Sequence, residues 1–138
     1  MTEHRGLNMN RLVTLLLMSG LLFAGDALAH EASVTPLFQV KLDDLKNQEG
    51  LMLVVDYPAG VKSASHRHNA HTFVYVLAGS VVMQVAGGER KILKAGETFY
   101  ETPDDVHTVS ENASTTEPAK ILVFMVKEQA APPTIPVP

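Results

Sequence analysis

Short apolar segments separated by glycine and proline turns run through the chain from residue 36 to residue 127. They are rich in β-branched and aromatic residues, and no stretch after residue 30 keeps the helical period of about 3.6 residues. The segments predict strands at 36–42, 51–57, 72–77, 80–85, 90–93, 97–101, 106–110 and 120–127. Many short strands with regular turns favour an all-β fold, an antiparallel sandwich or barrel. The link Ala78-Gly79 predicts a hairpin between 72–77 and 80–85.

The first 29 residues carry the features of a secretory signal peptide. Arg11 precedes a mainly apolar run at 12–24, and the small-residue exit Ala27-Leu28-Ala29 follows it. This run is too short for a membrane span, which takes about 20 residues. We therefore expect residues 1–29 to be removed, with Met9 as an alternative start, and the mature protein to be periplasmic or secreted. The alternative is a buried N-terminal helix.

The composition suits one small domain. The chain has 138 residues, a formal net charge of −4 and no cysteine, so one core is expected and thiolate chemistry is excluded. The mild negative charge is not clustered and does not attract a phosphate backbone, so nucleic acid is not an expected partner. We expect a barrel at residues 30–129 and a tail at 130–138. The four prolines of the tail keep it out of a central ladder, so it is either loose or an extended strip on the surface.

Three of the six histidines, His66, His68 and His71, lie together just before the segment 72–77. In an extended chain side chains alternate, so His66 and His68 point to the same side. Two adjacent imidazoles repel each other when protonated and fill a core poorly when neutral, whereas a shared cation satisfies both ring lone pairs. The alternative is an exposed, solvated pair on an edge strand.

Glycines at fixed distances from these histidines form two blocks that resemble the motifs of the cupin superfamily. The first cupin motif, G-x5-H-x-H-x3/4-E-x6-G, is matched at Gly60, His66, His68 and Gly79. The second, G-x5-P-x-G-x2-H-x3-N, is matched at Gly96 and His107. The resemblance covers about residues 36–127. It implies an all-β, antiparallel double-sheet jelly-roll barrel that brings both motifs together inside.

The chain departs from these motifs at four positions. Thr72 stands where the first motif has its glutamate, and Thr102, Asp104 and Glu111 stand at the proline, glycine and asparagine positions of the second. The turn changes leave the barrel intact. The loss of the glutamate removes an anionic ligand, because a threonine hydroxyl is a poor neutral one, and it leaves the identity of the metal open.

The resemblance implies one divalent transition metal held by His66, His68 and His107, with His107 on the strand that faces the other two. Three imidazoles leave positions open for water, substrate or dioxygen and suit iron, manganese, nickel, copper or zinc. Two less favoured ligand candidates are His71 and Thr72, at or next to the position of the missing glutamate.

Glu101 and Tyr100 are the candidate catalytic residues, and Glu101 is also a candidate ligand. They lie in the segment before His107, where Phe99 and Glu101 share one face and Tyr100 lies on the other. If Phe99 packs inside, Glu101 is buried as well, and a buried carboxylate needs a cation or a hydrogen-bond donor. Glu101 would then serve as ligand, as partner of a ligand or as base. Tyr100 would supply a pocket hydroxyl, unless it serves only for packing.

By resemblance, the function is a metal-dependent reaction of oxygenase, isomerase or lyase type on a small molecule. One alternative is a non-catalytic module that binds or senses a metal or a small ligand. Another is a metal-free structural cupin whose histidines form only hydrogen bonds. The sequence has no glycine-rich phosphate loop and no serine in a nucleophile setting, which argues against nucleotide binding and acyl-enzyme chemistry. Cupin barrels commonly pair through their sheets, so a homodimer is also expected.

Overall fold

Alternation of buried and exposed side chains gives the strands β4 (Ala70–Ala78) and β9 (Ala119–Glu128) two distinct faces. The inward face of β4 carries small and aliphatic residues such as Val74 and Val76, and its outward face carries aromatic residues such as Phe73 and Tyr75. A period of two is the pattern of a strand that buries one face only. The two strands pair with each other, so their buried faces form one continuous surface.

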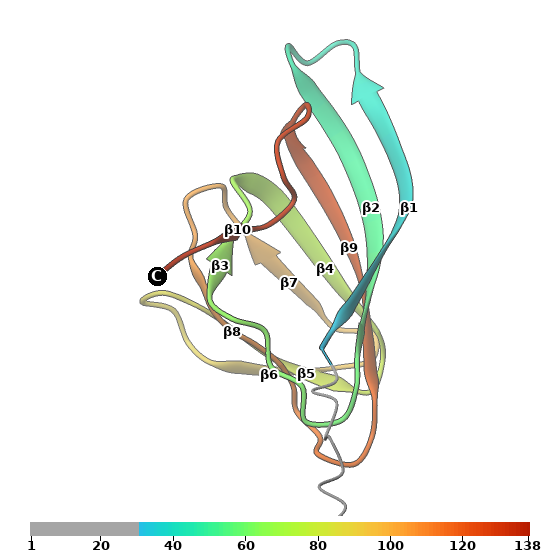
Figure 1. The fold of residues 1–138 in the computed structure, drawn as a ribbon, viewed down its shortest axis with the longest axis vertical. Coiled ribbons are helices and arrows are strands. Elements are labelled where there is room, and N and C mark those ends of the chain that lie inside the picture. Colours follow the sequence, from blue (N-terminus) through green and yellow to red (C-terminus); the bar gives the residue numbers. More distant parts are fainter. Residues whose placement is uncertain (1–30) are drawn as a thin grey trace, which may run out of the picture.

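The structure is a computed structural model that describes residues 31–138 as two five-stranded sheets (Figure 1). The first sheet has the order β1 (Ser33–Leu42), β2 (Gln48–Tyr57), β9, β4, β7 (Thr98–Glu101). The second has the order β10 (Ile135–Pro136), β3 (His66–Arg67), β8 (His107–Asn112), β5 (Ser80–Val85), β6 (Lys91–Lys94). All pairings are antiparallel, which confirms the predicted all-β, double-sheet fold.

The predicted double-sheet jelly-roll barrel is confirmed as two antiparallel sheets, but the described strands do not close into a barrel. The edge strands are β1 and β7 in the first sheet and β10 and β6 in the second. Within residues 31–138 no strand of one sheet pairs with a strand of the other. The two sheets are instead held together by side chains packed between them. The fold is a sandwich of two antiparallel sheets.

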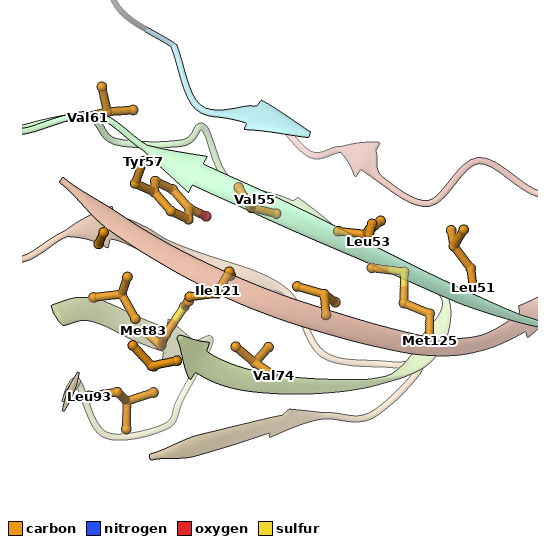
Figure 2. Packing of buried hydrophobic residues seen from close by; sticks show 14 of the residues in the cluster. Leu51, Leu53, Val55, Tyr57, Val61, Val74, Met83, Leu93, Ile121 and Met125 are labelled. Carbon is orange, nitrogen blue, oxygen red and sulfur yellow. The ribbon is translucent and has the colours of Figure 1, made fainter. Parts of the chain in front are cut away.

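The core lies between the sheets, and most of its residues come from β2, β4, β5 and β9 (Figure 2). Val76, Val81 and Met83 are at most 1% exposed. Burial of one such side chain stabilises the fold by about 1.5–3 kcal/mol. The first sheet thus contributes an apolar wall behind the region where the histidines lie.

The predicted hairpin between 72–77 and 80–85 is wrong, because β4 belongs to the first sheet and β5 to the second. Gly79 lies between them with a φ of 69°. A Cβ atom there would lie 2.5 Å from the carbonyl oxygen of Pro118, so only glycine fits. The turn after β4 therefore carries the chain from one sheet to the other instead of folding it back.

The tail returns from the end of β9 across β3 (Figure 1). Ile135 and Pro136 pair with Arg67 and His66 as an edge strand, which is the extended strip that was one of the two expected forms. The sequence did not predict β3, whose two residues are too few for a strand pattern.

The predicted signal peptide lies outside the described residues. In the described part of the chain, no helix is long and apolar enough to cross a membrane.

Candidate metal centre

The structure brings the rings of His66, His68 and His107 together. One ring nitrogen from each residue can be chosen so that all three lie within 4.8 Å of one another. His66 on β3 is the direct cross-strand partner of His107 on β8, so the two rings come from neighbouring strands of the same sheet. This differs from the expectation that His107 would lie on a facing strand.

His68 reaches the same place from the turn that follows β3. Asn69 adopts a φ of 49°, which bends the chain directly after His68 and before β4 of the other sheet begins. Asparagine tolerates this left-handed conformation better than most residues do. The turn thus places His68 between the two sheets, with its side chain 10% exposed.

Backbone carbonyl groups fix the tautomers of two rings. Nδ1 of His66 donates to the carbonyl oxygen of Ala64 at 2.8 Å, and Nδ1 of His68 donates to the carbonyl oxygen of Pro133 at 2.7 Å. A carbonyl only accepts, so in each neutral ring Nε2 keeps its lone pair. Burial lowers the pKa of His66 against the effect of its bond to Ala64, and the neighbouring rings lower it further. The lowered pKa of His66 favours the neutral form that binds metals.

A carboxylate and a hydroxyl from the first sheet face the three rings. Oε2 of Glu101 on β7 lies 3.2 Å from Nδ1 of His107 and 3.7 Å from Nε2 of His68. Thr72 on β4 is the cross-strand partner of Glu101, and both are at most 2% exposed. Phe99 is partly buried against the core, which agrees with the predicted inward face of this strand.

Buried polar atoms without a hydrogen-bond partner gather at this place. Among residues 31–138 they include both ring nitrogens of His107, Oε2 of Glu101 and the hydroxyl of Thr72. Each such atom costs free energy if nothing compensates for its lost hydration. Ring nitrogens and a carboxylate oxygen are ordinary ligands of divalent transition metals. The donor set therefore fits such a metal ion.

His71 and Tyr100 do not join the site. They point to the outer face of the first sheet, where Nδ1 of His71 lies 2.7 Å from the hydroxyl of Tyr100. The physical reason is the alternation in their strands, because the neighbours Thr72 and Glu101 take the inward positions. The structure thus separates these two candidates from the three rings.

A cavity of about 280 Å³ is lined by residues of both sheets, the three histidines among them. Most of its wall is aliphatic, from residues such as Leu53, Val55 and Val123. Its polar groups include the hydroxyls of Tyr57 and Ser110, which are hydrogen-bonded to each other at 2.7 Å. No lysine or arginine occurs among the lining residues that the structure describes.

The tail supplies part of the same wall, a role that the sequence did not predict. Pro133, Thr134 and Pro136 line the cavity. Upstream, the ammonium of Lys127 donates to the carbonyl oxygen of Ala131 and pairs with Glu49. A buried lysine at the end of β9 thus anchors the segment that closes the site.

A family model described as "Cupin domain" matches residues 53–125, and the chain belongs to this family. No curated protein sequence matches the chain.

Solved structures with the same fold come from several organisms. A double-stranded β-helix protein from Klebsiella pneumoniae is 22% identical, with a TM-score of 0.59 over 73% of this chain and 81% of that one. A cupin-like protein from Thermotoga maritima is 20% identical, with a TM-score of 0.61 over 77% and 75% of the two chains. The DMSP lyase DddQ from Ruegeria pomeroyi is 20% identical, with a TM-score of 0.56 over 64% of this chain and 43% of the lyase. At these identities the likeness shows the fold alone.

Proposed function

We propose that this cupin binds one divalent transition metal through His66, His68 and His107 and acts with it on a small uncharged molecule in the cavity. The observation that carries this proposal is the convergence of three imidazoles, with His66 half-buried and both ring nitrogens of the buried His107 without a hydrogen-bond partner in the described structure. Iron, manganese, nickel, copper and zinc all suit such a set. When bound, the metal supplies Lewis acidity or activation of dioxygen in an oxygenase, isomerase or lyase reaction.

The chain's own groups bind the substrate and keep water out. The aliphatic wall from Leu53, Val55 and Val123 favours an apolar molecule. The hydroxyls of Tyr57 and Ser110 can turn toward one polar group of that molecule, since either can donate. An anionic substrate is disfavoured, because the lining has no lysine or arginine and already holds the carboxylate of Glu101.

A second candidate is a module that binds or senses a ligand without turnover. It is favoured by the sparse ionisable groups of the lining, which are the three histidines, Glu101 and Tyr57. General acid–base catalysis needs a proton donor or acceptor within reach of the reacting atoms. With the rings committed to a metal, only Glu101 and Tyr57 of the described lining remain for this role, and Glu101 is itself a candidate ligand.

Metal analysis of untagged protein tests the metal site. We expect about one equivalent of a transition metal, which His66→Ala and His107→Ala lose. The matched control is His71→Ala, which removes an imidazole from the outer face of β4 and should retain the metal. Metal-free wild-type protein, or full retention by both variants, would refute the site.

A second measurement separates the enzyme from the binding module. The iron-loaded protein is mixed with a panel of uncharged small molecules, and both oxygen uptake and product formation are followed. An enzyme converts at least one molecule catalytically. A binding module changes only its optical spectrum.

We further propose that residues 1–29 direct export to the periplasm or the medium, supported by their basic, apolar and small-residue order. The mass of the mature protein tests this, with His30 expected as its first residue. Ala29→Arg should block the processing.

We also propose a homodimer formed through the outer face of the first sheet. Phe73, Tyr75 and Tyr100 are each more than 40% exposed there and line a shallow hollow together with Leu122 and Phe124. Contiguous exposed apolar surface of this kind marks interaction sites.

A further inference from the structure

The cupin motif places a glutamate at the position that Thr72 occupies here, and the structure shows which residue stands opposite. Thr72 on β4 and Glu101 on β7 are direct cross-strand partners. The Cβ atoms of such partners lie about 4.5–5.5 Å apart on the same face of the sheet. A side chain from either position therefore reaches the same region between the sheets.

We infer that Glu101 is the anionic metal ligand of this protein and replaces the missing glutamate from the neighbouring strand. This inference rests on the proposed metal site. It assigns ligation to a variable position of the second cupin motif, the last of the five residues between Gly96 and the proline position at Thr102. With it, a divalent ion at the three histidines carries a net site charge of +1 in place of +2.

The contacts of Glu101 support ligation. Its Oε2 atom lies 3.7 Å from Nε2 of His68, and that nitrogen holds a lone pair because Nδ1 donates to Pro133. Two acceptor atoms that face each other in a buried place repel, unless a cation lies between them. Two ligand atoms about 2.1 Å from one metal ion are about 3.0–3.4 Å apart at ligand angles of about 90–109°. The distances from Oε2 of Glu101, 3.2 Å to Nδ1 of His107 and 3.7 Å to Nε2 of His68, are close to this spacing.

No other cation is available to Glu101 within residues 31–138. Its ion pairs are with His68 and His107 alone. The buried Glu111 shows the contrast, because it pairs with Lys62 and Arg90. The rival explanation is that Nδ1–H of His107 donates to Glu101, which would then orient the ring without binding the metal itself.

Cobalt titration of the full chain tests the inference. Co²⁺ affinity is measured by competition with a chelator, and the ligand set is followed by the visible absorption of the bound Co²⁺. We expect Glu101→Gln to weaken binding by ~10–100-fold and to change the absorption spectrum. The matched control is Glu111→Gln, which removes another buried carboxylate and should keep both the affinity and the spectrum of the wild type.

A swap of the two cross-strand partners shows whether a loss of metal affinity comes from the missing carboxylate or from a folding defect. Glu101→Thr alone should lose affinity as Glu101→Gln does. The double variant Thr72→Glu/Glu101→Thr returns the carboxylate to the motif position with unchanged composition, and it should recover affinity to within about threefold of the wild type.

The outcomes distinguish this inference from the proposed function. If Glu101→Gln binds Co²⁺ with wild-type affinity and spectrum, the inference is wrong and the three-histidine site stands. If affinity falls but the spectrum is unchanged, Glu101 only positions His107, and its role as ligand is overturned. If the wild type itself binds no Co²⁺, the metal site fails and the inference fails with it.

Discussion

The imidazole of His68 donates a hydrogen bond from Nδ1 to the backbone carbonyl of Pro133, 65 residues further along the chain. The bond fixes the tautomer of the ring and leaves the lone pair on Nε2, which lies 3.7 Å from Oε2 of Glu101. Groups that hold a metal-binding histidine in this way contribute strongly to metal affinity. The tail is therefore part of the candidate metal centre.

A chain that ends at Ala131 should bind metal ~10–100-fold more weakly than the full chain. It loses the carbonyl that orients His68 and the strand β10 that pairs with β3. Affinity is measured by competition with a chelator. A chain that lacks only the exposed Pro138 is the control and should bind as the wild type does. Equal affinity of the two truncated chains would show that the tail has no role in the site.

Replacement of Gly79 by alanine should destabilise the fold by about 2–5 kcal/mol. The new Cβ would meet the Pro118 carbonyl at 2.5 Å, in addition to the strain of a φ of 69°. Gly87 is the matched control, since its φ is 74° and nothing lies within 4 Å of an added Cβ. Gly87→Ala should cost only about 1–2 kcal/mol. Urea unfolding measures both, and equal losses would disprove the close approach.

The sequence predicted the strands and the three histidines because both depend on local patterns. Alternation and turn residues defined β4 and β9 to within two residues at each end. The motif spacing selected His66, His68 and His107, which the structure brings together.

Features that depend on long-range pairing could not be read from the sequence. The pairing of Thr72 with Glu101 and the bond from His68 to Pro133 join residues 29 and 65 positions apart. The hairpin error has the same cause, because the sequence of a glycine turn does not say which sheet the next strand joins. That depends on the pairing of β5 with β6 and β8, which are distant along the chain or follow later.

The buried pair of Glu49 and Lys127 should make stability depend on pH in the acid range. Hydrogen bonds from Lys127 and then Gln39 lower the pKa of Glu49 below its usual value of about 4.5. The folded state thus holds this proton more weakly than the unfolded state does. Its contribution is fully present above about pH 4.5 and is lost as the pH falls through the lower folded pKa.

Urea unfolding of metal-free protein between about pH 3 and pH 7 checks this dependence. Glu49→Gln should be less stable by about 1–3 kcal/mol at pH 7 and should lose less on acidification than the wild type. The control is Glu97→Gln, an exposed carboxylate on the loop before β7, which should follow the wild-type curve apart from a small offset. Parallel curves for wild type and Glu49→Gln would contradict the linkage.

Disruption of the exposed aromatic face should separate the proposed homodimer without harm to the metal site. Phe73 is 47% exposed on the outer face of β4, and its neighbours Thr72 and Val74 point the opposite way, toward the cavity. Phe73→Asp would bury a charge in the dimer interface, which is expensive without a partner, and should shift the protein to the monomer. Sedimentation measures the state of association and metal analysis the site. Ile92→Asp is the control, because Ile92 is 65% exposed on β6 of the other sheet and should stay dimeric. A Phe73→Asp protein that sediments as the wild type does would place any interface elsewhere.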